Sequence, residues 1–336
     1  MPCNVVVGGF FGDEGKGKII AYLAKKDNPS IAARGGVGPN AGHTFVVSGN
    51  TYKVRMLPSA ALNPNTRLLI GAGVLINPQI LFEEIKIFNA KDRVFVDSQC
   101  GIIEKNHIEK DKNDYLRTKI GTTGTGTGPA NSDRALRILK IAKDFPELLP
   151  YIEDVSDSIN YALDNKEKVI IEGTQGTFLS LYHGEYPFVT SRDVTSPAIC
   201  SDVGIGPKRV DGILLVFKAY VTRVGQGPLK NEIHEEEARR RGWIEFGSVT
   251  GRQRRASPFD MDLAKKSIRL NSATELAVTK LDVVFPACSG VYEYSKLPIE
   301  AKKFIENIEA ETSLKVTVIG TGAEIMDIID RRTSIK

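Results

Sequence analysis

The chain has 336 residues, of which 41% are hydrophobic and 26% charged, and its formal net charge is +4. This length allows a large buried core, in one big α/β domain or in two domains. The mild charge argues against a nucleic-acid-binding protein, and no window approaches the 18 consecutive apolar residues of a membrane-spanning helix, so neither a nucleic acid nor a membrane is an expected partner.

Cysteine and histidine usage gives no sign of a metal centre or a disulfide framework. The four cysteines and four histidines are scattered along the chain without the spacing of a zinc site. The segment Met1–Val7 lacks the basic region that begins a secretory signal peptide. We therefore expect reduced thiols and a cytoplasmic location.

Apolar runs bounded by glycine or charged residues predict buried strands. In chain order they are Asn4–Val7, Arg67–Gly73, Arg93–Val96, Val169–Gly176 and Gly212–Tyr220. Helices are expected at Lys16–Lys26, Pro78–Phe88, Ser132–Lys143 and Leu149–Leu163, and a β-hairpin at Thr44–Leu57. The alternation predicts an α/β protein with a large, mainly parallel central sheet flanked by helices, with long functional loops, in a single domain over residues 1–336.

The segment Gly8–Ile20, GGFFGDEGKGKII, is a glycine loop between a predicted strand and a predicted helix. Such a loop presents backbone N–H groups to phosphate at a helix N-terminus. The standard P-loop sequence is not met, because Gly17 follows Lys16 where Ser or Thr would bind magnesium. Asp13 could replace that hydroxyl as an oxygen ligand, or could remove a proton from a substrate. The structural alternative is that Asp13 and Glu14 only cap the helix.

Further segments carry side chains suited to small anionic substrates. They are RGGVGPNAGHT (Arg34–Thr44), IGTTGTGTGPAN (Ile120–Asn131), EGTQG (Glu172–Gly176), VTGRQRR (Val249–Arg255) and TKLD (Thr279–Asp282). The first contains His43, a candidate acid or electrostatic group. The second is a hydroxyl-rich anion loop, and the arginine cluster favours a carboxylate-bearing substrate, with a solvated basic loop as the alternative. The lysine and aspartate of TKLD could select guanine over adenine.

Together these segments resemble the adenylosuccinate synthetase family, whose members join aspartate to IMP with GTP. The resemblance covers nearly the whole chain and is closest to the compact archaeal-type members. It rests on motifs in the family's order: GDEGKGK (Gly12–Lys18), NAGH (Asn40–His43), GTTGTGTGPA (Gly121–Ala130), EGTQGT (Glu172–Thr177), YPFVTS (Tyr186–Ser191), TGRQRR (Thr250–Arg255) and TKLD. The resemblance implies a P-loop-related nucleotide-binding fold and a ligase of AMP biosynthesis.

The resemblance also implies a mechanism in two steps. Asp13 would act as general base on N1 of IMP, so that the purine O6 attacks the γ-phosphate of GTP. Asp13 and the carbonyl of Gly42 would ligate Mg²⁺, and His43 would stabilise the phosphate oxygens. The amino group of aspartate would then displace phosphate from the 6-phosphoryl intermediate. A carboxylate inside the phosphate loop is needed because the lactam nucleophile must first lose a proton.

The substrate contacts follow from the matched motif positions. For GTP the resemblance implies Gly12, Glu14, Gly15, Lys16, Gly17, Lys18, Gly42, His43, Thr44, Lys280, Asp282, Gly320, Thr321 and Gly322. For IMP it implies Asp13, Lys16, Asn40, Ala41, Thr123, Arg137, Gln175, Thr190 and Arg252. For aspartate it implies Val249, Thr250, Arg252 and Arg254. Arg137, placed in the helix after the second glycine loop, would reach the partner's IMP in a homodimer.

The sequence departs from the family pattern in four places. Thr125 stands where the family usually has arginine, and Phe10-Phe11 where it has Gln-Trp. The segment Ala256–Phe259 replaces a typical Gly-Trp pair, and GTGAEI (Gly320–Ile325) lacks the usual Pro-Asp-Arg. A substrate contact normally made by the arginine is therefore lost or supplied by another residue.

Two other functions fit parts of the pattern. A phage-type relative of the same fold would condense aspartate with dGMP and often use ATP, but the retained Asp13 and the TKLD segment favour IMP and GTP. A GTP-binding module without ligase activity would bind GTP irrespective of IMP and aspartate. It would have no use for the carboxylate-binding arginines at Arg252–Arg255.

Overall fold

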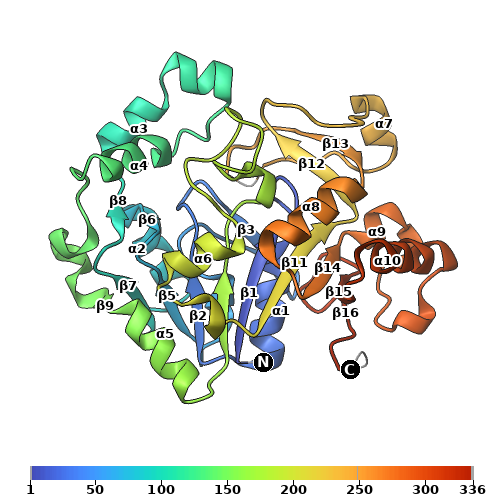
Figure 1. Cartoon of the computed structure of the whole chain (residues 1–336), viewed down its shortest axis with the longest axis horizontal. Helices are drawn as coiled ribbons and strands as arrows, with labels where there is room; N and C mark the ends of the chain where they lie inside the picture. The colour runs from blue at the N-terminus through green and yellow to red at the C-terminus, as the bar shows by residue number, and fades with distance from the viewer. Residues whose placement is uncertain (1, 248, 334–336) are drawn as a thin grey trace.

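In the computed structural model, which describes residues 2–247 and 249–333, the elements alternate between strands and helices along most of the chain (Figure 1). The principal helices are α1 (Lys16–Asp27), α2 (Pro78–Ile87), α3 (Lys105–Asp111), α4 (Thr127–Ala135), α5 (Val155–Asp164), α6 (Ser196–Asp202), α7 (Glu235–Arg240), α8 (Met261–Asn271), α9 (Leu281–Val284) and α10 (Ile299–Thr312).

A ten-stranded sheet forms the centre of the molecule. In spatial order its strands are β16 (Ile328–Asp330), β15 (Val316–Gly320), β14 (Glu275–Thr279), β11 (Gly212–Lys218), β1 (Cys3–Gly8), β10 (Val169–Glu172), β2 (Ile31–Arg34), β5 (Arg67–Ile70), β7 (Val94–Asp97) and β9 (Ile152–Glu153). Within the described residues, every neighbouring pair is parallel apart from β15 and β16. The predicted α/β class and the mainly parallel sheet are therefore confirmed.

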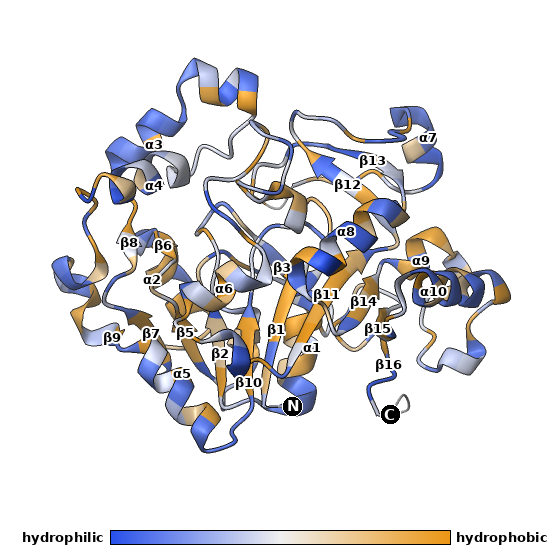
Figure 2. Ribbon diagram, in the orientation of Figure 1, coloured by the Kyte–Doolittle hydropathy of each residue, from blue (hydrophilic) through white to orange (hydrophobic). Residues whose placement is uncertain are grey.

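Helices cover both faces of this sheet, because successive residues of each strand point to opposite sides. Val5 and Val7 of β1 belong to the apolar cluster that includes α5, α6, α8 and α10. Val6 belongs to the cluster formed with α1 on the opposite face. Figure 2 shows the resulting pattern, with apolar central strands and a more hydrophilic outer helix α3. Strands buried on both faces are continuous apolar runs, which is why the sequence predicts β1, β5, β7, β10 and β11, whereas the short buried strands β2, β14 and β15 are not predicted.

Three smaller pairs of strands extend from the ends of the central sheet. The predicted hairpin is present as β3 (His43–Val47) and β4 (Asn50–Val54), and its antiparallel register pairs His43 with Val54. Strand β12 (Tyr220–Val224) directly follows β11 and pairs antiparallel with β13 (Arg254–Pro258). We call β12 and β13 the ribbon. The third pair is β6 (Leu75–Ile76) with β8 (Gly101–Ile102).

Two predicted helices are shifted in the structure. The helix expected at Ser132–Lys143 is α4, which starts at Thr127 and ends at Ala135. It starts earlier because Pro129 lies in the first turn of the helix. The N–H groups of that turn have no acceptor within the helix, so the missing N–H of proline does no harm there. It ends earlier because Arg137 adopts a left-handed conformation (φ 64°), so Arg137 lies beyond the helix and not in it.

The helix expected at Leu149–Leu163 also begins later, as α5 at Val155. The Asp154 side chain accepts a hydrogen bond from the Asp157 backbone N–H (2.8 Å) and caps the helix there. The residues before it form a short 3₁₀ helix (Pro146–Tyr151) and strand β9.

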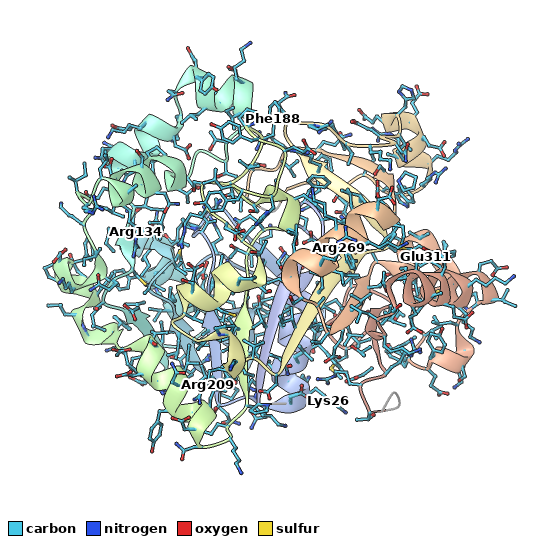
Figure 3. All side chains as sticks on the ribbon, in the orientation of Figure 1. Lys26, Arg134, Phe188, Arg209, Arg269 and Glu311 are labelled. Atoms are coloured by element: carbon cyan, nitrogen blue, oxygen red, sulfur yellow. The ribbon has the colours of Figure 1, made fainter. Side chains whose placement is uncertain are left out.

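Side-chain contacts fasten helices to neighbouring loops. The Nη2 of Arg134 in α4, labelled in Figure 3, donates to the Ala72 carbonyl (3.0 Å). Helix α1 is tied to the C-terminal segment: Lys18 Nζ donates to the carbonyls of Gly322 (2.7 Å) and Asp327 (2.8 Å). Further along α1, Tyr22 Oη donates to Asp330 Oδ2 (2.9 Å).

Candidate active site

A cavity of about 1190 Å³ lies where the carboxyl ends of the central strands meet their loops. The strand order reverses at β1, and open α/β sheets place their ligands outside the strand ends at such a point. The loops after β1, β2, β10 and β14 all contribute to the lining, together with β3, the second glycine loop and the segment before the ribbon's β13. Nearly all the segments that the sequence analysis predicts to bind substrates therefore line this cavity.

Most of the predicted site residues line this one cavity. They are Gly12, Asp13, Gly15, Lys16, Gly17, Lys18, Asn40, Ala41, Gly42, His43, Thr44, Thr123, Gln175, Thr190, Val249, Thr250, Arg252, Arg254, Lys280, Asp282 and Gly322. The other predicted residues, Glu14, Arg137, Gly320 and Thr321, are not part of the lining.

The phosphate loop is held together by Glu14. This residue is only 1% exposed, and its Oε1 accepts hydrogen bonds from the backbone N–H groups of Phe10 (3.0 Å) and Gly12 (2.8 Å). Its Oε2 lies 2.9 Å from Lys16 Nζ, which also donates to the Gln175 carbonyl. Gly15, at φ 84°, provides the left-handed turn from which α1 starts. Glu14 thus satisfies donors within the loop instead of facing the cavity.

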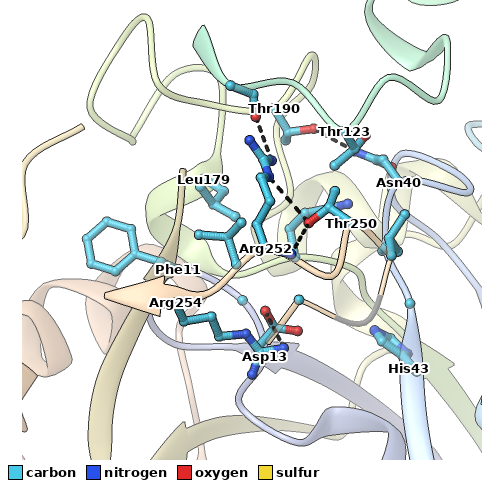
Figure 4. A pocket seen from close by; sticks show the side chains of 18 of the residues that line it. Phe11, Asp13, Asn40, His43, Thr123, Leu179, Thr190, Thr250, Arg252 and Arg254 are labelled. Carbon is cyan, nitrogen blue, oxygen red and sulfur yellow. Dashed lines mark hydrogen bonds and ion pairs between the residues drawn. The ribbon is translucent and has the colours of Figure 1, made fainter. Parts of the chain in front are cut away.

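Asp13 has a different environment from its neighbour Glu14. Its backbone is left-handed (φ 62°), and its side chain turns toward the ribbon, where Oδ2 lies 2.9 Å from Arg254 Nη2 (Figure 4). Burial raises the pKa of Asp13, while the positive charges of Arg254 and Lys218 lower it. The carboxylate is thus partly desolvated and paired, which suits a base better than a fully hydrated carboxylate would be.

His43 is fixed by charged residues at the ends of two strands. Arg34 and Glu172 end β2 and β10 and pair in the sheet register, and Arg34 Nη1 lies 2.8 Å from Glu172 Oε1. The same Glu172 oxygen contacts His43 Nδ1. Burial lowers the pKa of His43 to about 4, although the Glu172 carboxylate acts in the opposite direction. A neutral imidazole that donates through Nδ1 to Glu172 is the consistent arrangement.

Besides Arg254 Nε, three side chains in the cavity wall have polar atoms without a hydrogen-bond partner among the described residues. These atoms are Asn40 Oδ1, Gln175 Nε2 and Asp282 Oδ1, and each is buried. Unsatisfied buried polar atoms are rare in native proteins, so these atoms are candidate contacts for a substrate. Asn40 also donates through Nδ2 to Thr190 Oγ1 (3.2 Å), which links the NAGH segment to the YPFVTS segment.

The arginine segment contacts the second glycine loop. Arg252 Nη2 donates to the Gly121 carbonyl (2.8 Å), and Arg252 Nε lies 3.4 Å from Thr250 Oγ1. The glycine loop itself is held by Asp111, which accepts hydrogen bonds from Thr122 Oγ1 and the Gly126 N–H (both 2.8 Å). One guanidinium of the cluster thus already bridges two of the predicted substrate loops.

Lys18 supports the C-terminal part of the cavity. Its ammonium contacts two carbonyls of the segment that contains Gly322, as described above, and burial lowers its pKa to about 8. In the same region, the Thr321 hydroxyl donates to the Val291 carbonyl (2.9 Å). The contacts of Lys18 in this structure are therefore to protein carbonyls.

The structure explains one departure from the family pattern and places a second. Phe10 packs in the core against Phe217, with ring centroids 4.7 Å apart, and the Arg223 guanidinium stacks on the Phe11 ring at 4.5 Å. The Phe10-Phe11 pair therefore serves packing. Thr125 Oγ1 lies 3.0 Å from Thr123 Oγ1, and Thr125 does not line the cavity.

Several residues of the site are not predicted from sequence. Glu172 and Arg34 could have been found, because a charged residue at the end of an apolar strand is itself a signal. Glu245 and Asp111 carry no such signal. Glu245 lines the cavity and binds Arg254, yet it stands in an ordinary loop sequence between Ile244 and Phe246.

Comparison with known proteins identifies the family. The model of the adenylosuccinate synthetase family matches residues 5–145 and 137–287. The adenylosuccinate synthetase of Thermococcus onnurineus is 54% identical over 339 residues, with 100% of both chains covered. That of Methanococcus vannielii is 51% identical over 336 residues, with 99% of each chain covered. The chain belongs to the adenylosuccinate synthetase family. Its full-length match to these relatives confirms the compact form expected from the sequence.

Solved structures agree with this assignment. The fully ligated adenylosuccinate synthetase from Plasmodium falciparum superposes with a TM-score of 0.90 at 26% identity, covering 99% of this chain and 100% of that one. The succinoaminodeoxyadenylate synthetase of cyanophage S-2L, bound to dGMP and dATP, has a TM-score of 0.82 at 24% identity and supports the fold alone. The expected reaction class, a ligase of purine biosynthesis that uses GTP, is confirmed at the level of the family.

None of the helices within residues 2–247 and 249–333 combines the length and apolar character needed to cross a bilayer.

Proposed function

We propose that the protein ligates L-aspartate to IMP at the expense of GTP, through 6-phosphoryl-IMP, and releases adenylosuccinate, GDP and phosphate. The observation that carries this proposal is that a single cavity is lined by the phosphate loop, by Lys280 and Asp282, and by the Arg252 and Arg254 guanidinium groups. These groups suit, respectively, a nucleoside triphosphate, a guanine edge and the carboxylates of an amino acid.

Asp13 would be the general base. It would take the proton from N1 of IMP, and the electron pair would make O6 the nucleophile toward the γ-phosphorus of GTP. The pKa raised by burial supports this role, because a base works best when its pKa approaches the working pH. The aspartate amino group would then attack C6 and lose a proton, and the C6–O6 bond would break so that O6 leaves with the phosphoryl group as inorganic phosphate.

Asp13 and the carbonyl of Gly42 would also hold Mg²⁺. Both residues line the cavity, and a carboxylate and a carbonyl are oxygen donors of the kind that Mg²⁺ prefers. Two protein ligands are enough, because Mg²⁺ usually completes its coordination with waters and substrate phosphates. When bound, the ion would supply positive charge to the transferring phosphoryl group. Lys16 would have to turn from Glu14 and the Gln175 carbonyl to meet the phosphates.

His43 would stabilise the phosphate oxygens through Nε2. Glu172 holds Nδ1 and so fixes the ring orientation. The proposal requires His43 to be doubly protonated when GTP is bound. The negative charge of the phosphates and of Glu172 would favour this state, against the effect of burial on its pKa.

The three polar atoms that have no partner among the described residues give contacts to IMP and to GTP. Asn40 Oδ1 and Gln175 Nε2 would contact IMP, and Asp282 Oδ1 would accept from the N–H groups of guanine. Thr190, Thr123 and Ala41 complete the proposed IMP site. Thr250, Val249, Arg252 and Arg254 complete the proposed aspartate site.

We also propose that the protein forms a homodimer. Arg137 is exposed beyond α4 and does not line the cavity of its own chain, which supports a contact with IMP in a partner subunit. Its neighbours Leu136 and Ile138 are 65% and 67% exposed, which fits burial between two copies in a homodimer. We also propose a single domain over the chain and a cytoplasmic location. The four free, buried cysteines support the latter.

The test is a direct assay of the purified protein with Mg²⁺, GTP, IMP and aspartate, following the ultraviolet change as the purine 6-oxygen becomes a substituted amine. Each substrate is omitted in turn, and ATP and dGMP are exchanged for GTP and IMP. Product formed only with the complete GTP, IMP and aspartate set is the expected result. Activity with dGMP and ATP would indicate the phage-type reaction. GTP hydrolysis that ignores IMP and aspartate would contradict ligase activity.

A further inference from the structure

A buried cluster of charged groups lies behind the arginine segment, at the junction of the central sheet and the ribbon. Its members are Lys218, Tyr220, Glu245 and Arg254, and we call it the Glu245 cluster. Lys218 is the last residue of β11, Tyr220 opens β12 and Arg254 opens β13. Lys218 and Tyr220 are fully buried, at 1% and 0% exposure.

Both oxygens of Glu245 are occupied. Oε1 accepts from Tyr220 Oη (2.5 Å), and Oε2 lies 2.8 Å from Lys218 Nζ and also contacts Arg254 Nη1. The backbone adds a further link, because the Arg254 N–H donates to the Glu245 carbonyl (2.9 Å). Tyr220 is in turn fixed by stacking on Trp243, with ring centroids 4.6 Å apart. Glu245 is thus anchored on one side to rigid elements and on the other to Arg254.

Arg254 is consequently held by two acids at once. One terminal nitrogen binds Glu245, the other lies 2.9 Å from Asp13, and Nε has no partner among the described residues. A long arginine side chain loses conformational freedom when it is fixed in this way, and a pre-positioned guanidinium binds a carboxylate more tightly than a mobile one. Glu245 Oε1 also lies 3.9 Å from Lys280 Nζ, on the side of the proposed guanine site.

We propose that Glu245 is a positioning residue that holds the Arg254 guanidinium between Asp13 and the incoming amino-acid carboxylate. Its partner Lys218 balances its charge, so that the buried carboxylate does not attract Arg254 fully away from Asp13. The inference rests on the proposed function, because it takes the roles of Arg254 and Asp13 from there. Charge balance matters in such a site, because an unpaired buried charge is costly.

The experiment measures KM for aspartate, GTP and IMP, together with kcat and the melting temperature, in Glu245→Gln. The variant keeps the shape of the side chain but removes the charge that holds Arg254. We expect KM for aspartate to rise by about tenfold or more, since small displacements of a binding group have effects of this size. We expect KM for IMP to stay near the wild-type value. Unchanged aspartate KM in a folded Glu245→Gln protein would overturn the proposal.

Glu245→Gln leaves the buried charge of Lys218 without its counter-charge. A second variant therefore separates the positioning role from stability. In the double variant Glu245→Gln with Lys218→Met, one negative and one positive charge are removed together. We expect the melting temperature to recover toward the wild-type value while the aspartate KM stays raised. Recovery of both quantities would mean that Glu245 acts only through stability and would overturn the proposal.

The matched control is Glu232→Gln. Glu232 pairs with Arg255, the next residue of β13, at 2.7 Å, and this pair is partly exposed. We expect all three KM values to remain unchanged in this variant. The wild type is assayed first: if it fails to form adenylosuccinate, the proposed function fails, whereas an active wild type with an unaffected Glu245→Gln contradicts the positioning role alone.

Discussion

Arg254 Nη2 lies 2.9 Å from Asp13 Oδ2, so the acid of the phosphate loop has a counter-charge that comes from the ribbon. The two residues are far apart in sequence and meet because β12 continues from β11 and pairs with β13. This ion pair allows Asp13 to remain ionised in a partly desolvated site. It also places a carboxylate-binding group directly beside the proposed base.

Replacing Asp13 by Asn should remove most of the activity and leave the fold intact. Asn has nearly the same shape and tolerates the left-handed backbone at φ 62°, so the variant isolates the loss of the base. Turnover should fall by about 10²–10⁴-fold, the usual contribution of general acid–base catalysis. The measurement is kcat with all substrates saturating, with circular dichroism as the check on folding. Residual turnover near the wild-type rate would rule out the general-base role.

The pH dependence of kcat/KM for IMP should show an acid limb that belongs to Asp13. The base must be ionised, so activity falls as the pH falls through the pKa of Asp13. Because burial raises this pKa, the limb should lie above the value of about 3.9 that is found for Asp in model peptides. In Asp13→Asn the residual activity should lack this limb. A limb that persists in that variant would have to be assigned to another group.

Arg252→Leu should raise the aspartate requirement far more than the IMP or GTP requirement. Losing a guanidinium that binds a carboxylate costs about 2 kcal/mol or more, so KM for aspartate should increase by about 30-fold or more. Arg255→Leu is the control, since Arg255 belongs to the same cluster but pairs with Glu232 outside the cavity. An equal loss for all three substrates would point to a structural role, because Arg252 also contacts the Gly121 carbonyl.

Asp282→Asn should weaken the preference for GTP over inosine triphosphate, which lacks the 2-amino group of guanine. Asp282 Oδ1 is buried with no hydrogen-bond partner in the part of the chain that the structure describes, and a carboxylate can accept from two guanine N–H groups. We expect the ratio of kcat/KM values for the two nucleotides to fall by about tenfold or more, as for the loss of one hydrogen bond to a charged group. An unchanged ratio would show that guanine is read elsewhere.

Glu14→Ala should destabilise the protein by about 3–5 kcal/mol, because it leaves the buried Lys16 ammonium without its counter-charge and two loop N–H groups without their acceptor. The free energy of unfolding in denaturant measures this loss. Glu109→Ala is the matched control: its pair with Lys105 is exposed and should contribute about 0.5 kcal/mol or less. Similar losses in both variants would contradict the structural role of Glu14.

Half of the central sheet, namely β1, β5, β7, β10 and β11, and most of the cavity could be predicted from the sequence for a physical reason. Strands buried on both faces are apolar throughout, and the glycine loops that follow them keep a recognisable composition, as at Gly8–Ile20 and Glu172–Gly176. The helix ends are harder to predict. The end of α4 depends on the left-handed conformation of Arg137, and neither glycine nor asparagine stands at that position to indicate it.

The Glu245 cluster could not be predicted because it depends on tertiary structure. Lys218 lies within an apolar run and Glu245 within a polar loop, and neither position has a spacing that suggests a partner. Only the turn from β11 into β12 and the pairing of the ribbon bring the two groups to within 2.8 Å. Long-range ion pairs of this kind have no periodicity in the sequence.

The attachment of α1 to the C-terminal segment has a consequence for biosynthesis. Lys18 and Tyr22 are translated early, whereas their partners Gly322, Asp327 and Asp330 leave the ribosome late. These side-chain contacts of the helix that opens from the phosphate loop therefore cannot form until those distant residues are synthesised, and such non-local contacts are slow to form. We expect nascent chains arrested before β15 to leave this helix weakly protected and dependent on chaperones.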